Sequence, residues 1–166
     1  MKNLLSYYTT LSFLLLASQI NADIVDSTCK GTPNYKLCVD ILRKDPRSST
    51  ADIKGLALIT VNALQAHTIE TLGKIKNLRK SMPGLEVTLS GCKKNYDVVV
   101  NYDIPEAFEG LQKGNAKFAE SGVADAAVEA ELCEGSFGGS KSPLNEANKL
   151  EGEIANVARQ IIRKLL

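Results

Sequence analysis

The sequence of 166 residues is poor in the side chains on which most enzyme sites depend: it has one histidine, His67, and no tryptophan. A single histidine excludes a metal site built from several histidines, and any Cys–His or Ser–His catalytic pair would depend on it alone. The stretch from Gly135 to Gly139 lacks the lysine and the preceding strand that a phosphate-binding loop needs. We therefore expect no catalytic residues, no cofactor and no metal.

The chain also lacks an excess of charge of either sign. Its 20 lysines and arginines balance 19 aspartates and glutamates, and no basic run exceeds two residues. This pattern argues against nucleic acid as a partner, because such proteins present clustered positive charge to the phosphates. With 44% hydrophobic and 23% charged residues, the composition is that of one folded domain.

Residues 1–22 have the features of a secretory signal peptide. Lys2 precedes an apolar run from Leu11 to Ala17, and the small Ala22 ends a plausible cleavage site. The run is too short to span a bilayer, although a buried N-terminal helix is an alternative interpretation. We predict secretion to the apoplast or cell wall, with the vacuole as a second destination, no membrane partner after cleavage, and residues 23–166 as a single mature domain.

In an oxidising compartment the four cysteines should form two disulfides, for which three pairings exist. Cys29 and Cys38 are nine residues apart around a Gly-Thr-Pro turn, a spacing that suits a local bridge. Cys92 and Cys133 each occupy an apolar helical seam, so that a bond between them would join two helices from inside. These observations favour Cys29–Cys38 with Cys92–Cys133; the alternative is free buried thiols.

Apolar residues recur every three or four positions along most of the mature chain, which is the period of amphipathic helices. Four stretches show this period, at residues 50–82, 85–111, 119–137 and 147–165. Pro83-Gly84 ends the first stretch and Gly138-Gly139 the third, whereas Pro105 either interrupts the second stretch or starts a new turn there.

Two further signals place the helix starts. Ser142 and Pro143 suit the cap and the first position of the last helix, and Thr32 suits the cap of a short helical unit upstream. The loops are short, which favours antiparallel neighbours. The prediction is an all-α fold: an antiparallel up-and-down four-helix bundle over residues 49–166, preceded by a short helical hairpin over residues 23–48.

A lysine stands beside an aromatic residue at the break between two helical stretches. Asn115 can cap the helix that follows, which leaves Lys117 and Phe118 in its first turn. A cation there opposes the helix dipole, and an exposed phenylalanine is unfavourable unless a partner covers it. Two interpretations remain open: a pair that binds a partner, or a core Phe118 with a solvated Lys117. The physics of the sequence alone favours the second.

Several segments carry a resemblance that spans essentially the whole mature chain. They are the Cys29–Cys38 segment, Asp-Pro-Arg-Ser at 45–48, Leu-Ala-Leu-Ile at 56–59, Cys133, Ser-Lys-Ser-Pro at 140–143 and the terminal 161–166. In these the chain resembles the plant invertase and pectin methylesterase inhibitors. The resemblance implies a four-helix bundle with an N-terminal hairpin, and disulfides that join the first cysteine to the second and the third to the fourth.

The invertase branch of that family is the more similar, because it carries a Pro-Lys-Phe triplet followed by Ala-Glu. Lys117 and Phe118 match the triplet and Ala119 and Glu120 follow, but Ala116 stands at the proline position. In that branch the triplet enters the sucrose-binding cleft of acid invertase, a glycoside hydrolase with catalytic carboxylates. The resemblance thus implies a secreted inhibitor of cell-wall or vacuolar acid invertase that binds it through Ala116, Lys117 and Phe118.

In the implied 1:1 complex, Lys117 offers its ammonium group to acidic groups of the cleft and Phe118 fills apolar space or excludes water. We expect tighter binding at mildly acidic pH, and a loss of about 1 kcal/mol from the missing proline. The nearest alternative is a pectin methylesterase inhibitor, which would use its helical faces. A carrier bundle with an internal cavity is a rival from another class, and an enzyme is the remotest.

Overall fold

Residues 24–139 and 141–166 are described by a computed structural model; the predicted signal peptide, residues 1–22, lies outside them. Residues 24–29 are helical, and the elements that follow are helical too. They are α2 (Tyr35–Lys44), η1 (Pro46–Ser49), α3 (Ile53–Ser81), η2 (Pro83–Leu85), α4 (Glu86–Val98), η3 (Val99–Asp103), α5 (Ile104–Lys113), α6 (Ala116–Gly135) and α7 (Asn145–Arg163). The described ranges contain no strand.

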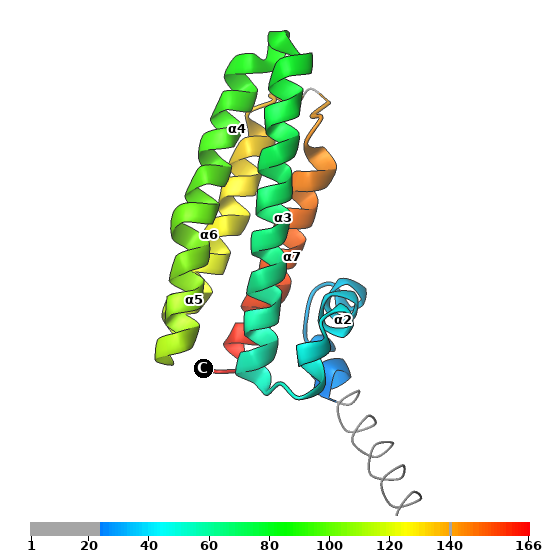
Figure 1. Ribbon diagram of the computed structural model, residues 1–166, viewed down its shortest axis with the longest axis vertical. Coiled ribbons are helices and arrows are strands. Elements are labelled where there is room, and N and C mark those ends of the chain that lie inside the picture. Colours follow the sequence, from blue (N-terminus) through cyan, green and yellow to red (C-terminus); the bar gives the residue numbers. More distant parts are fainter. Residues whose placement is uncertain (1–23, 140) are drawn as a thin grey trace, which may run out of the picture.

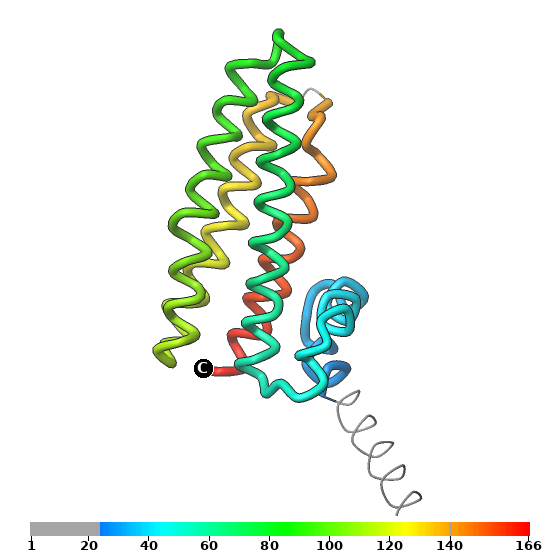
Figure 2. Tube along the Cα trace, in the orientation of Figure 1, coloured from blue at the N-terminus to red at the C-terminus, as the bar shows by residue number. Residues whose placement is uncertain are grey.

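The helices form the predicted up-and-down bundle. In Figure 1, α3 rises along the long axis, α4 and α5 descend, α6 rises again, and α7 descends to the C-terminal end. The short helix α2 lies beside the lower part of α3, as the tube in Figure 2 also shows. The all-α architecture and the N-terminal hairpin expected from the sequence are thus confirmed.

The second bundle helix passes through Pro105 without a break. Val99–Asp103 forms a turn of π-helix, in which the Ile104 N–H donates to the carbonyl of Val99. Proline has no N–H to give to the turn before it, and the wider π turn directly ahead of α5 accommodates that missing bond. Pro105 therefore interrupts the apolar period, since the buried Val99 and Ile104 are five residues apart, but it does not end the helix.

Two of the expected helix starts are displaced. Asn34 caps α2 by accepting a bond from the Leu37 N–H, whereas the Thr32 hydroxyl donates to the carbonyl of Cys29 at 2.7 Å. The last helix begins at Asn145 instead of position 143, because the Oγ of Ser142 accepts a bond from the Leu144 N–H in the preceding turn. In both places the polar residue makes a local turn bond, which competes with capping.

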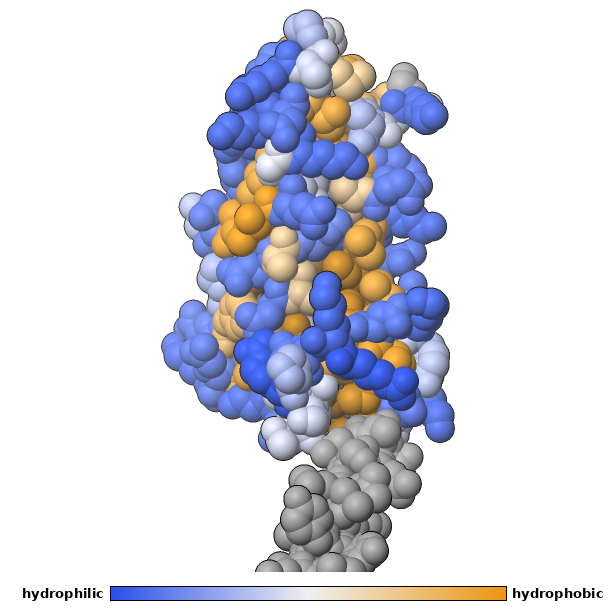
Figure 3. Space-filling model, turned by 45° about the vertical axis from the view of Figure 1, so that its right-hand side comes forward, coloured by the Kyte–Doolittle hydropathy of each residue, from blue (hydrophilic) through white to orange (hydrophobic). Residues whose placement is uncertain are grey.

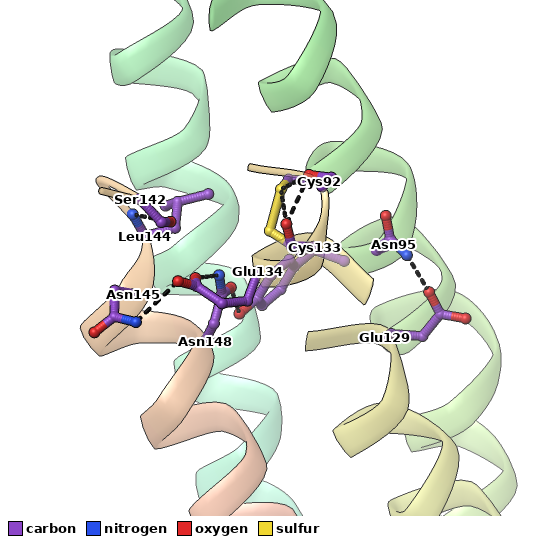
Figure 4. Close-up of a disulfide and its surroundings, with 11 residues drawn as sticks. Cys92, Asn95, Glu129, Cys133, Glu134, Ser142, Leu144, Asn145 and Asn148 are labelled. Carbon is purple, nitrogen blue, oxygen red and sulfur yellow. Dashed lines mark hydrogen bonds between the residues drawn. A yellow bond between two sulfur atoms is a disulfide. The ribbon is translucent and has the colours of Figure 1, made fainter. Parts of the chain in front are cut away.

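The disulfides join Cys29 to Cys38 and Cys92 to Cys133, and all four cysteines are fully buried. Figure 4 shows the second bond linking α4 to the end of α6. Beside it, Glu134 accepts bonds from Asn145 and Asn148 of α7, at 2.8 and 2.6 Å. The covalent link and these charge-assisted bonds hold three helices together at one end of the bundle.

The core runs between the helices as two clusters of buried apolar side chains, one of them around the Cys92–Cys133 bond. On the face shown in Figure 3, hydrophilic side chains cover most of the bundle and apolar ones appear between them. Ala119, Ala126 and Ala130 on α6 are buried, so this helix packs closely, as the alanine-rich seam predicts. No helix in the described part of the chain is long and apolar enough to cross a membrane.

Candidate functional site

The turn between α5 and α6 fixes the position of the predicted target-binding residues. Gly114 has the left-handed conformation (φ 73°), and its N–H donates to the carbonyl of Leu111 while the Asn115 N–H donates to that of Gly110 at 2.8 Å. These two bonds form a Schellman motif, for which glycine is the favoured residue. Helix α5 therefore ends sharply, and only Gly114 and Asn115 separate it from α6.

Asn115 then caps α6. Its Oδ1 accepts a bond from the Phe118 N–H at 3.1 Å, as the sequence predicts. Ala116, the first residue of α6, is nearly buried, whereas the side chain of Lys117 is 76% exposed and Phe118 is 39% exposed. Phe118 is therefore not a core residue, and the interpretation that the sequence alone favoured is wrong for this side chain.

Close contact between α5 and α6 stiffens this end of the bundle. A Cβ placed on Gly110 would lie 2.4 Å from the backbone nitrogen of Ala119, and one placed on Gly122 would lie 2.4 Å from the carbonyl oxygen of Asp103. The two helices pack backbone to backbone only because glycine occupies both positions. The first turns of α6, which carry Lys117 and Phe118, are thus held on a rigid support.

Glu120, which the sequence places in the family motif, has a structural role that sequence reasoning missed. It is only 4% exposed, and it accepts bonds from Lys117 at 3.0 Å, Arg163 at 2.7 Å and Arg159 at 3.2 Å. The hydrogen bonds from Arg163 and then Lys117 lower the pKa of the Glu120 carboxyl to about 2. The carboxylate is therefore ionised throughout the physiological range, and it ties the start of α6 to the end of α7.

A sequence signal for this cluster exists in retrospect. Glu120 lies three residues after Lys117, inside a helix face that is otherwise alanine and valine, and a charge at such a core position needs partners. Arg159 and Arg163 are four residues apart near the end of α7. Only the antiparallel packing of α6 on α7 shows that they serve the same carboxylate.

A hollow of about 190 Å³ lies next to Ala116. Residues from the start of α3, the end of α5, the turn and the C-terminal tail line it, namely Lys54, Gly110, Leu111, Gly114, Ala116 and Leu165. Figure 1 shows the turn and the C-terminal end of the chain at the same end of the bundle, away from the turn between α3 and α4. Ala116, the residue before Lys117, thus lines this hollow, whereas Lys117 and Phe118 do not.

Residues 23–165 match the sequence profile of the family described as plant invertase/pectin methylesterase inhibitor. The chain belongs to this family. The inhibitor is 46% identical over 138 residues to a cell wall/vacuolar inhibitor of fructosidase 1 from Arabidopsis thaliana, covering 83% of this chain and 67% of that protein. It is 40% identical over 88 residues to cell wall/vacuolar inhibitor of fructosidase 2 of the same plant, covering 51% of this chain and 49% of that one.

A solved structure supports the fold. A crystal structure of a mutant form of a pectin methylesterase inhibitor from Arabidopsis superposes with a TM-score of 0.71 at 22% identity, covering 81% of this chain and 92% of that one. The family and the relatives are inhibitors, so the protein is an inhibitor and not an enzyme. Among the described residues, no three or more His, Cys, Asp or Glu side chains are grouped so as to hold a metal ion.

Proposed function

We propose that this protein is a secreted inhibitor of plant acid invertase. The observation that carries the proposal is the exposed pair of Lys117 and Phe118 on the capped first turn of α6, in a chain 46% identical to a protein named as an inhibitor of fructosidase. Cleavage after Ala22 would release the mature domain into the secretory pathway, toward the cell wall or the vacuole.

In the proposed complex the inhibitor occludes the sucrose-binding cleft with one copy per enzyme. The cleft of a glycoside hydrolase is lined by carboxyl groups, one of which must be ionised for catalysis. The Lys117 ammonium would pair with such a group, and Phe118 would cover apolar surface and exclude water around that pair. Because the turn is already ordered, little conformational entropy is lost when it docks.

The charge of the inhibitor supports tighter binding in mild acid. Burial, and then the nearby carboxylate of Asp125, raise the pKa of the Asp103 carboxyl to about 6. Asp103 is therefore mostly neutral at pH 5 and mostly ionised at pH 7.5, so that the inhibitor is more positive in acid. At the lower pH, an ionised carboxyl group in the invertase cleft therefore faces an inhibitor whose charge is more complementary to its own.

To test this, the full chain is expressed with secretion and its oxidised product is purified. This protein is then titrated in parallel against an acid invertase and a plant pectin methylesterase. We expect saturable, stoichiometric loss of sucrose hydrolysis, stronger at pH 5 than at pH 7.5. Replacing Lys117 or Phe118 with alanine should weaken inhibition about tenfold or more, as expected for residues at the centre of an interface.

Two controls match these variants in chemistry and exposure. Lys93→Ala removes a lysine that is ion-paired to Asp97 on α4, and Leu132→Ala removes an exposed apolar side chain further along α6. Neither should change the inhibition of invertase. The proposal would be contradicted if the protein inhibited only pectin demethylation and the Lys117 and Phe118 variants inhibited it equally well. That result would favour a pectin methylesterase inhibitor.

A further inference from the structure

The carboxylate of Glu120 divides its bonds unequally between its two oxygens. Oε1 accepts from the Nε–H groups of both Arg159 and Arg163, whereas Oε2 accepts from the Lys117 ammonium. If Lys117 turns away toward a partner, Oε1 still has two cationic donors and Glu120 is not left as an uncompensated buried charge. Lys117 is mostly exposed to solvent, so its ammonium can exchange this bond for a partner while the two arginines keep the buried carboxylate paired.

The cluster holds more positive charge than its carboxylate needs. Three cations surround one anion, and the side chains of Arg159 and Arg163 are 36% and 42% exposed. The pair of Arg79 and Glu86 on the opposite end of the bundle shows the simpler case, in which one arginine serves one carboxylate. The two arginines bond to Glu120 through Nε–H and are partly exposed, so each keeps further guanidinium N–H donors, on the same carboxylate that Lys117 contacts.

We propose that Glu120 is a positioning residue, and that the three cations it gathers, Lys117, Arg159 and Arg163, form one docking surface for the carboxylate groups that line the cleft of acid invertase. This inference rests on the proposed function and extends it from the first turn of α6 to the last two turns of α7. The occupant follows from charge: a planar guanidinium pairs with a carboxylate through two parallel N–H donors.

Glu120→Gln separates positioning from simple attraction, because the two ideas predict opposite signs. The variant raises the net charge of the surface by one, so attraction alone predicts tighter inhibition. If Glu120 holds the cations in place, inhibition weakens about threefold to tenfold despite the added positive charge. Equal or tighter inhibition by Glu120→Gln would overturn the positioning role.

The arginines are tested singly. Arg159→Gln and Arg163→Gln should each weaken inhibition about threefold to tenfold in low salt, with a smaller loss in 0.5 M NaCl, because rim charges act mainly through long-range attraction. Arg79→Gln is the matched control, since it also removes an ion-paired arginine, and it should leave inhibition unchanged. If neither the Arg159 nor the Arg163 variant changes inhibition, the proposal that these arginines belong to the docking surface is wrong.

Folding is checked by thermal unfolding of every variant. If Glu120→Gln does not fold, Arg163→Lys replaces it: this change keeps the charge but removes the Nε–H that donates to Glu120. Weaker inhibition by Arg163→Lys supports positioning, and unchanged inhibition overturns it. Lack of invertase inhibition by the wild-type protein overturns the proposed function as well, whereas loss of inhibition by Lys117→Ala with unaffected arginine variants overturns this inference alone.

Discussion

At the scale of the residue, the most unusual side chain is Glu151, which is fully buried in α7. Its Oε1 lies 2.5 Å from the hydroxyl oxygen of Thr68, and that hydroxyl also lies 2.9 Å from the carbonyl of Leu64. A threonine has one proton to donate, and a carbonyl can only accept. Both contacts are satisfied when Glu151 is protonated and donates to Thr68.

Burial raises the pKa of the Glu151 carboxyl to about 8, in agreement with this proton count. His67 does not supply a closer partner, because its Nε2 donates to the carbonyl of Ala147 at 3.0 Å and lies 3.7 Å from Glu151 Oε2. No hydrogen-bond partner for that oxygen occurs in the described part of the chain. The inhibitor thus buries a carboxylic acid that is neutral in an acidic compartment.

The stability of the fold should therefore fall as the pH rises. The folded pKa of Glu151, about 8, lies above its ordinary value of 4.5, so the stabilising contribution is complete below pH 4.5 and is lost progressively up to about pH 8. We expect the free energy of unfolding to decrease by about 1–3 kcal/mol between pH 5 and pH 7. Urea titrations across this range measure it.

Glu151→Gln is the direct test of that assignment, because glutamine has the same shape and stays neutral. The variant should lose most of the pH dependence and should be more stable than the wild type at pH 7. A wild-type slope that Glu151→Gln leaves intact would show that other groups, such as Asp103, carry it. Nothing in the sequence distinguishes Glu151 from other glutamates, since a glutamate in a helix is usually solvated.

Sequence reasoning placed Asn115 at the cap and Lys117 and Phe118 in the first turn of α6, because these positions depend on neighbours within four residues. It missed the exposure of Phe118 and the cluster around Glu120, which depend on how α6 lies against α7. Local hydrogen bonds are encoded locally, but the burial of a given side chain depends on segments that are distant in the sequence. The Asn115 cap is therefore confirmed, whereas the target-binding role of Ala116, Lys117 and Phe118 stays a prediction.

At the scale of the element, the first turn of α6 carries Ala116 where the invertase branch of the family has proline. Ala116 is the first residue of the helix, a position where proline is favoured because its N–H has no partner within the helix. The preceding residue, Asn115, already has a non-helical backbone (φ −98°, ψ 79°), which a following proline requires. The structure can therefore accept proline at this position.

Ala116→Pro should stabilise the protein by about 0.4–1 kcal/mol by restricting the unfolded chain. It should also strengthen invertase inhibition about twofold to fivefold, because less freedom remains to be lost on docking. Thermal unfolding and inhibition titrations measure the two effects. Ala124→Pro, in the interior of the same helix, is the control that should destabilise. Weaker inhibition by a stable Ala116→Pro protein would contradict this account.

The boundaries of the elements were less predictable than their existence. The apolar period identified all four bundle helices, since each must bury one face. The π turn at Val99–Asp103 and the start of α7 at Asn145 were not foreseen, because several polar residues near a helix end compete for the same backbone groups. The choice among them follows from tertiary packing.

At the scale of the whole molecule, one disulfide stabilises the N-terminal hairpin and the other stabilises the bundle. Cys29–Cys38 closes a short loop within the hairpin, whereas Cys92–Cys133 joins α4 to α6 across 41 residues. The hairpin is tied to the bundle by few polar bonds, among them that from Asn34 to Glu153 of α7 at 3.0 Å. The proposed site lies on α6 and α7, so its geometry depends on the packing of the bundle.

Removing the two disulfides separately should therefore give different results. Replacing Cys92 and Cys133 with alanine should lower the free energy of unfolding by about 2–5 kcal/mol, with inhibition lost as the bundle loosens. Replacing Cys29 and Cys38 should mainly speed amide hydrogen exchange in α2, while the bundle helices stay protected and invertase inhibition persists. Loss of inhibition with an intact, protected bundle would instead place the hairpin within the invertase interface, and the docking surface would then have to extend from the end of α7 across to α2.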